Sequence, residues 1–214
     1  MTFRGWPPTA IEFYRGLEVD NSKAYWLSHK DVYERDVKAP MLELLDELAD
    51  PFGEARLFRP YRDIRFSADK SPYKTAIAAM LGAGYVRLGS DGLRVGAGMY
   101  HLEPGQLERY RAAVADDQSG PELERVLAQA RRARLEVHGT ESLKTAPQGY
   151  PKNHPRVELL RYKGIVVMKG WPVAPWLGTP TAKKRVIDVF RAAAPLVDWL
   201  GRHVEPPGPT VRRR

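Results

Sequence analysis

One segment in the middle of the chain carries the residue types that bind anions. Residues 56–74 contain six lysines and arginines against two aspartates, which gives a local net charge of +4. Guanidinium and ammonium groups donate several hydrogen bonds to phosphate or carboxylate oxygens, and on an ordered loop they form a receptor for such groups. The sequence therefore predicts a site for an anionic ligand, with four ligand-binding cations: Arg62, Arg65, Lys70 and Lys74.

Local sequence features favour a fixed conformation for this segment. If residues 61–66 form a strand, Asp63 and Arg65 lie on one face, where the carboxylate orients the guanidinium by charge-assisted hydrogen bonds. Asp63 is then also a candidate catalytic carboxylate. Pro72 holds the residue before it extended, and Asp69 can accept backbone hydrogen bonds in a turn. The alternative interpretation is structural, with the same charges forming a salt-bridge network that fixes a β-turn-β unit to neighbouring helices.

A second group of polar side chains lies in a Pro- and Gly-rich loop predicted over residues 144–155. Lys144 and Tyr150 are candidate ligand-binding residues there, because ordered loops of this kind often border sites. His154 in this loop, and His101 at the expected end of a strand, are candidate proton carriers. The alternatives are a plain surface crossing for the loop and a hydrogen-bonded structural role for each histidine.

The composition excludes several kinds of site. The chain has no cysteine, which rules out a disulfide scaffold, a zinc-thiolate site, an iron–sulfur cluster and a thiol nucleophile. Its five histidines show no paired spacing, so we expect no metal site. The sequence also lacks a P-loop, a nucleophile elbow and a complete dinucleotide-binding fingerprint, and it indicates no particular cofactor.

The overall charge and hydropathy indicate where the protein works. The net charge of +8 includes three terminal arginines, and half of it lies in residues 56–74. No stretch of about 18 apolar residues is present, and the N-terminus lacks the apolar core of a signal peptide. We therefore expect a cytoplasmic protein without a membrane partner.

Helices are predicted at both ends of the chain. Asn21 is a good cap for an early helix, and Ser119 with Glu122 forms a possible capping box for a later one. The last helix contains Pro195, which is expected to kink or divide it. One helix in the first third has a clear apolar stripe at i, i+3, i+4 and i+7: Met41, Leu44, Leu45 and Leu48.

The centre of the chain is predicted to be β. Strands are expected over 75–81, 84–88 and 93–101, with an Asp-Gly turn between the last two. Strands in the middle with helices before and after them predict an α+β fold with a mainly antiparallel sheet. We expect one globular domain over residues 1–204 and a flexible Pro- and Arg-rich tail over 205–214.

Several of these pieces together resemble a known family. The pattern Arg-Asp-Ile-Arg-Phe-Ser-x-Asp-Lys-x-Pro-Tyr-Lys over 62–74 is similar to the signature of the bacterial and fungal family called domain of unknown function 2461. Other pieces agree in order: Asn21–Trp26, Gly96–Tyr100 and Leu143–Pro151. The resemblance covers about residues 8–204 and implies no particular activity. The family usually has two asparagines where this chain has Asp20 and Asn21.

Three functions are compatible with the sequence. The first is an enzyme or small-molecule-binding protein with a basic site for a phosphate- or carboxylate-bearing ligand, and it expects the candidate residues to share one pocket. The second is a nucleic-acid-binding protein that uses the basic segment, with Tyr61 and Tyr73 as stacking partners. The third is a protein–protein module without catalysis, which expects an exposed apolar patch.

Overall fold

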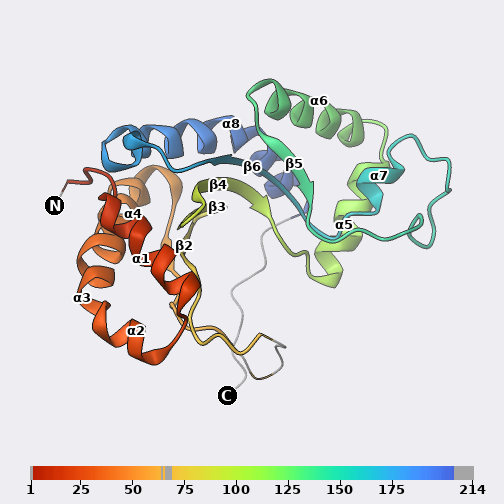
Figure 1. Ribbon diagram of the computed structural model, residues 1–214. Helices are drawn as coiled ribbons and strands as arrows, with labels where there is room; N and C mark the ends of the chain where they lie inside the picture. Colours follow the sequence, from red (N-terminus) through yellow and green to blue (C-terminus); the bar gives the residue numbers. More distant parts are fainter. Residues whose placement is uncertain (1, 64, 66–68, 205–214) are drawn as a thin grey trace, which may run out of the picture. The chain divides into compact units, whose positions relative to one another are not determined.

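The computed structural model describes residues 2–63, 65 and 69–204, and its strands form an antiparallel sheet (Figure 1). Six strands are hydrogen-bonded in the order β1-β2-β3-β4-β6-β5. Their bounds are β1 Ala55–Leu57, β2 Ala76–Leu81, β3 Gly84–Gly89, β4 Gly92–Met99, β5 Glu136–Gly139 and β6 Ile165–Trp171. Two-residue turns follow β2 and β3, so the predicted Asp-Gly hairpin turn is confirmed.

Helices precede and follow the central strands. The N-terminal set is α1 Pro8–Val19, α2 Lys23–Ser28, α3 Lys30–Val32, the π-helix η1 Tyr33–Lys38 and α4 Ala39–Phe52. The later set is α5 Pro104–Ala115, α6 Ser119–Arg132, α7 Val157–Leu160, the 3₁₀-helix η2 Pro175–Gly178 and α8 Thr181–His203. The predicted α+β class is therefore confirmed.

The chain groups into two compact units. Unit 1 comprises Met1–Val95 and Gly170–Phe190, and unit 2 comprises Gly96–Lys169 and Arg191–Arg214. The single domain over residues 1–204 stays a prediction. The predicted tail over 205–214 lies outside the described residues.

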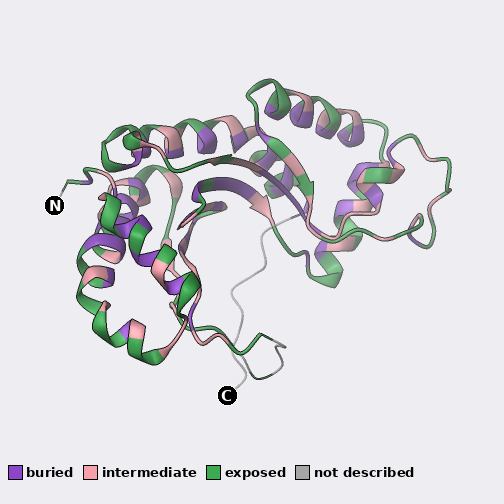
Figure 2. Ribbon diagram, in the orientation of Figure 1, coloured by how far each residue is buried: buried purple, intermediate pink, exposed green. Residues whose placement is uncertain are grey.

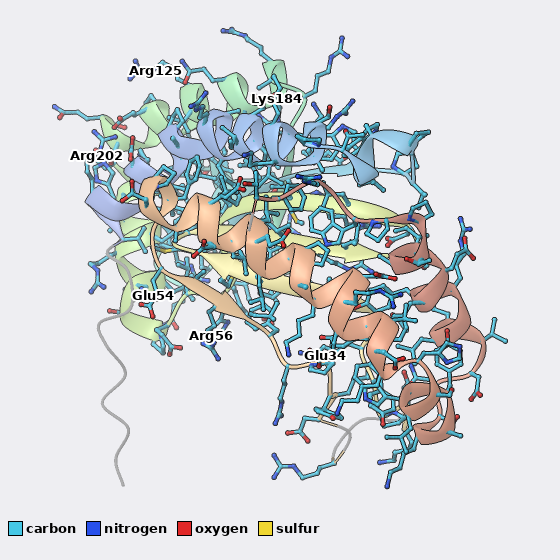
Figure 3. All side chains as sticks on the ribbon, turned by 90° about the vertical axis from the view of Figure 1, so that its left-hand side faces the viewer. Glu34, Glu54, Arg56, Arg125, Lys184 and Arg202 are labelled. Carbon is cyan, nitrogen blue, oxygen red and sulfur yellow. The ribbon has the colours of Figure 1, made fainter. Side chains whose placement is uncertain are left out.

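Unit 1 is built around helix α4, which lies across one face of β1 and β2 (Figures 1 and 3). The apolar stripe predicted for this helix is fully buried: Met41, Leu44, Leu45 and Leu48. Burying each such side chain contributes about 1.5–3 kcal/mol. Figure 2 shows the resulting pattern, with buried residues toward the sheet and exposed ones on the outer side. The 3.6-residue periodicity of the sequence thus fixes which face of α4 packs on the strands.

Several local expectations were wrong in detail. Ser22, not Asn21, caps α2, since its hydroxyl accepts a hydrogen bond from the backbone N–H of Tyr25 at 3.1 Å. At the start of α6, the carboxylate of Asp116 accepts from the backbone and hydroxyl of Ser119, so the expected capping box is absent there. Helix α8 continues through Pro195, so the expected division is absent, and the alternative, a kink at Pro195, stays a prediction.

Unit 2 contains a buried arginine, Arg156, for which no sequence pattern predicts burial. The guanidinium of Arg156, in a residue that is 8% exposed, donates to the carbonyls of Val114, Ala115 and Asp116 at 2.6–3.1 Å. These carbonyls are at the C-terminal end of α5, where the helix leaves backbone acceptors unpaired and where a positive charge is favourable. Arg156 therefore caps α5 and joins it to the segment before α7.

This cap leaves no room for a side chain at Gly120 on α6. A Cβ there would lie 2.4 Å from both Arg156 Nε and the carbonyl oxygen of Val114. We expect Gly120→Ala to lower the free energy of unfolding by about 2–3 kcal/mol, because backbone must move to relieve the overlap. Urea denaturation followed by circular dichroism measures the change.

Gly201→Ala is the matched control. Gly201 is also in a helix, and a Cβ there meets nothing within 4 Å. Better helix propensity should make this variant slightly more stable than the parent. Equal effects of the two substitutions would contradict the proposed role of the Arg156 cap.

Candidate functional site

The basic segment, residues 56–74, contains two short antiparallel arms in unit 1, and residues 64 and 66–68 between these arms lie outside the described residues. The backbone N–H of Arg62 donates to Pro72 O at 2.9 Å, and that of Lys74 donates to Pro60 O at 2.8 Å. Tyr61 and Tyr73 form an isolated β-bridge between these bonds. The strand predicted over 61–66 is thus reduced to this single bridge among the described residues, and Ile64 and Phe66 lie outside them.

The side-chain amide of Asn21 holds one of these arms in place. Its Nδ2 donates to Tyr73 O at 3.1 Å, and its Oδ1 accepts from Tyr73 N at 3.0 Å. Both backbone polar groups of a buried residue are thereby satisfied by one side chain, 52 positions away in sequence. Asn21 therefore replaces the neighbouring strand that Tyr73 lacks on that side.

Aromatic packing reinforces this attachment. The indole of Trp26 stacks on the Tyr73 ring with centroids 4.4 Å apart and planes 6° from parallel. Tyr61 packs against the same two rings at 6.1 and 5.6 Å but remains 51% exposed. Tyr33 lies beneath Trp26 at 4.8 Å, and its burial, with smaller contributions from Glu34 and Tyr61, raises its pKa to about 12. This aromatic cluster therefore leaves Tyr61 half exposed to solvent.

Two ion pairs within the loop involve several of the predicted site residues. Asp63 accepts from Arg65 Nε at 2.9 Å and Nη2 at 2.7 Å, which confirms the predicted pairing of these two side chains. Arg62 pairs with Asp69, whose carboxylate also accepts from Ser71 N. All four charged side chains are well exposed to solvent. Arg62, Asp63 and Arg65 therefore already have partners within the segment, and their roles as ligand-binding or catalytic residues stay predictions.

Two other cations, Arg56 and Lys74, lie over the ring of Phe58, and Arg59 is close enough to Lys74 to repel it; we call these three cations the basic face. The Arg56 guanidinium carbon and Lys74 Nζ lie 5.8 and 5.5 Å from the Phe58 ring centroid, within cation–π range. Desolvation, with added repulsion from Arg59, lowers the pKa of Lys74. Within the described part of the chain none of the three forms an ion pair. The uncompensated charge therefore lies at the base of the loop.

Lys70, the fourth predicted cation of the basic segment, is exposed in unit 1. The other predicted site residues belong to unit 2. His101 and Lys144 are exposed, and His154 Nδ1 accepts from the backbone N–H of Arg156 at 3.0 Å. Tyr150 is half-buried, with its backbone N–H bonded to Pro147 O. No hydrogen bond or ion pair links the four side chains to one another, although all four are described. A pocket shared with the basic segment stays a prediction.

Other kinds of site have little support in the described ranges. No three His, Asp or Glu side chains there are arranged to hold a metal ion. Nor is any helix among these residues both long enough and apolar enough to cross a membrane.

Sequence patterns do not identify the residues that organise the basic segment. They predict a helix cap at Asn21, and they assign no individual role to Arg56, Phe58 or Arg59. Cation–π and side-chain-to-backbone contacts leave no periodic pattern in a sequence. One sequence signal for the basic face is available: Arg59 and Lys74 lie on either side of the same charged stretch.

Removing the Asn21 amide should loosen the segment. Asn21→Ala leaves the N–H and C=O of buried Tyr73 without partners, so we expect about 1–3 kcal/mol of lost stability and faster hydrogen exchange at the Tyr73 amide. The control is Asn153→Ala, at an exposed loop asparagine. If Tyr73 exchanges equally slowly in parent and Asn21→Ala proteins, the amide does not hold the arm.

Asp69 should titrate far below an ordinary aspartate. Hydrogen bonds from the hydroxyl and backbone of Ser71, then from Arg62, lower its pKa to about 2. A depressed carboxyl pKa stabilises the fold above the unfolded-state value and loses that contribution as the pH falls through about 4 to about 2. Carbon NMR of the Asp69 carboxyl should give this pKa and a higher one in Ser71→Ala. Ser28→Ala should leave it unchanged, and a value near 4 in the parent would refute the hydrogen bonding.

Comparisons with known proteins give one similar solved structure and one matching family. A solved structure of an uncharacterized protein from Methanothermobacter thermautotrophicus is similar over 78% of this chain and 98% of its own length, with 11% sequence identity and a TM-score of 0.42. No curated protein matches the sequence. The family described as "Conserved hypothetical protein (DUF2461)" matches residues 9–199, which include the basic segment and most of each unit. The chain therefore belongs to the DUF2461 family.

Proposed function

We propose that this protein binds a phosphate- or carboxylate-bearing small molecule at the basic face. The observation that carries the proposal is the position of Arg56 and Lys74 over the Phe58 ring, with Arg59 near Lys74 and with no ion pair to any of the three among the described residues. Desolvation, and then repulsion from Arg59, lowers the pKa of Lys74. An anion placed between these cations relieves the repulsion and accepts their hydrogen bonds.

The arrangement is organised before any ligand arrives. Phe58 N donates to Ala78 O of β2 at 3.0 Å, and Lys74 follows the arm that Asn21 and Trp26 hold. The cations therefore project from ordered backbone, and less conformational entropy is lost when they close on a ligand. A merely solvated surface has no need of such attachment.

The proposal concerns binding and assigns no reaction. Asp63 is held by Arg65, and this interaction keeps the pKa of its carboxyl below the usual range. Its carboxylate is therefore a weak base, less suited to proton transfer near neutral pH. His101 and His154 stay predictions as proton carriers.

A nucleic acid is the second candidate ligand, favoured by one observation. Tyr61 exposes half of its surface while resting on Trp26 and Tyr73, so a base can stack on its open face. The phosphates of a single strand would then meet the basic face. Both candidates use the same cations and differ in their need for Tyr61.

Removing two cations of the basic face tests the proposal. We expect Arg59→Ala/Lys74→Ala to weaken binding of pyrophosphate about tenfold or more, as measured by titration calorimetry at low salt. The control is Arg4→Ala/Lys30→Ala, which removes the same net charge at exposed positions elsewhere in unit 1. Equal weakening in the two proteins would reduce the effect to overall charge, and no binding by the parent would refute a small phosphate ligand.

A labelled single-stranded oligonucleotide separates the two candidates in the same proteins. If a nucleic acid is the ligand, affinity falls steeply with salt, and Tyr61→Ala weakens it while Tyr100→Ala does not. Tyr100 is a suitable control because it is 75% exposed in unit 2. Pyrophosphate binding that is insensitive to Tyr61→Ala, without oligonucleotide binding, supports the small-molecule ligand.

A further inference from the structure

A groove opens in unit 1 between helix α4 and strand β1, on a part of the molecule that the proposed function does not use. It encloses about 440 Å³, and its apolar residues come from both elements: Leu42, Leu45 and Ala49 from α4, with Ala55 and Leu57 from β1. Leu42 is 45% exposed, so the groove presents apolar surface to solvent. Two carboxylate side chains, Glu43 and Asp46, also line it.

The strand that borders this groove has unused hydrogen-bonding groups. β1 is at the edge of the sheet, and its antiparallel register pairs Ala55 with Leu81 and Leu57 with Ala79. The ladder bonds to β2 fall on the alternate positions, as the bond from Phe58 N to Ala78 O and the bond from Gly82 N to Glu54 O show. In an antiparallel ladder the intervening residues direct their N–H and C=O groups away from the partner strand. Ala55 and Leu57 therefore offer these groups to the open edge.

The same two residues point their side chains into the groove. An added strand that pairs with Ala55 and Leu57 would thus place every second side chain over the apolar floor made with Leu42. Main-chain bonds supply affinity in such strand addition, and pockets for alternate side chains supply specificity. The groove and the open edge together form one site of this type.

The charge around the groove selects the kind of segment it accepts. Glu43, Asp46, Asp50 and Glu54 all lie on α4 or beside β1, and none of them has an ion-pair partner in the described residues. Glu47 on the same helix differs, because Lys183 and the backbone of Phe3 bind its carboxylate. Figure 3 shows Glu54 at the start of β1 and Arg56 on the side of the strand away from α4. The groove side is therefore acidic, whereas the opposite side of β1 is basic.

We propose that the groove docks an extended, basic segment of a partner protein, which adds to the sheet as a strand beside β1. Its groove-facing residues alternate between apolar and Lys or Arg, so that aliphatic stems cover Leu42 and Leu57 while the cations meet Glu43 and Asp46. The residues between them face Arg56 and are uncharged or acidic. The proposal is independent of ligand binding at the basic face.

A designed peptide tests this docking. The probe is fluorescein-labelled Thr-Lys-Thr-Val-Thr-Lys-Thr with blocked ends, in which Lys and Val share one face of the strand. Fluorescence anisotropy with the full chain measures binding, and amide NMR shifts report whether Ala55 and Leu57 are engaged. We expect saturable binding with shifts at both residues, and binding at least tenfold weaker when Glu replaces Lys in the peptide.

Backbone pairing and charge are then tested separately. N-methylation of the valine removes a main-chain donor that faces β1, and should weaken binding at least tenfold without changing any charge. Glu43→Lys/Asp46→Lys should do the same, whereas the control Asp31→Lys/Glu108→Lys, with equal net charge, should bind like the parent. These control positions carry no ion pair within the described chain.

Several results would overturn the proposal. Strand addition would be excluded if no binding occurred at peptide concentrations up to the millimolar range, or if N-methylation left the affinity unchanged. Equal loss in the groove variant and the charge-matched control would reduce the effect to net charge. Self-association of the chain in analytical ultracentrifugation that is abolished by Glu43→Lys/Asp46→Lys would assign the groove to a second copy instead.

Discussion

The pairing of the Asn21 amide with the backbone of Tyr73 is the constraint on which the basic segment depends. It joins the start of α2 to the arm that carries Lys74, across 52 residues of sequence. Each hydrogen bond contributes only about 1 kcal/mol net, but an unpaired buried N–H or C=O costs more than that. The stacking of Trp26 on Tyr73 adds to the same attachment. Together these contacts attach the arm that carries Tyr73 to α2 and to the residues just before it.

Charge in the basic segment is distributed unevenly, and the distribution follows from local chemistry. Asp63 and Asp69 each accept a hydrogen bond from a group two residues away, the guanidinium of Arg65 and the N–H of Ser71, and Asp69 also pairs with Arg62. Aspartate is short, so it binds such near neighbours readily and offsets two cations of the segment. No carboxylate occurs between Arg56 and Arg59, and Arg56 and Lys74 pack against the ring of Phe58. The surplus of charge thus collects around this ring, where no carboxylate among the described residues pairs with it.

The sequence predicted those features that depend on periodicity or on short-range chemistry. The stripe on α4, the turn after β3 and the pairing of Asp63 with Arg65 all involve residues within a few positions of one another. The cap predicted at Asn21 was wrong because an asparagine amide suits two roles equally well: it can cap a helix, or it can hydrogen-bond the backbone of a residue far away in sequence. The buried position of Arg156 was not predictable, because its partners are backbone carbonyls, which every residue has. Of the strand predicted over 61–66, the described residues show one bridge, from Tyr61 to Tyr73.

Strand β1 separates two surfaces of opposite charge, and the alternation of its side chains is the cause. Ala55 and Leu57 point into the acidic groove, while Arg56 and Phe58 point to the basic face. A shift of the β1–β2 register by one residue would move Arg56 into the groove and Leu57 beside Lys74, which would disrupt both surfaces together. The register is protected by the bonds at either end of the strand, from Gly82 N to Glu54 O and from Phe58 N to Ala78 O. Two sites of different chemistry can therefore lie one strand apart, because a period of two residues keeps their side chains on opposite faces of the sheet.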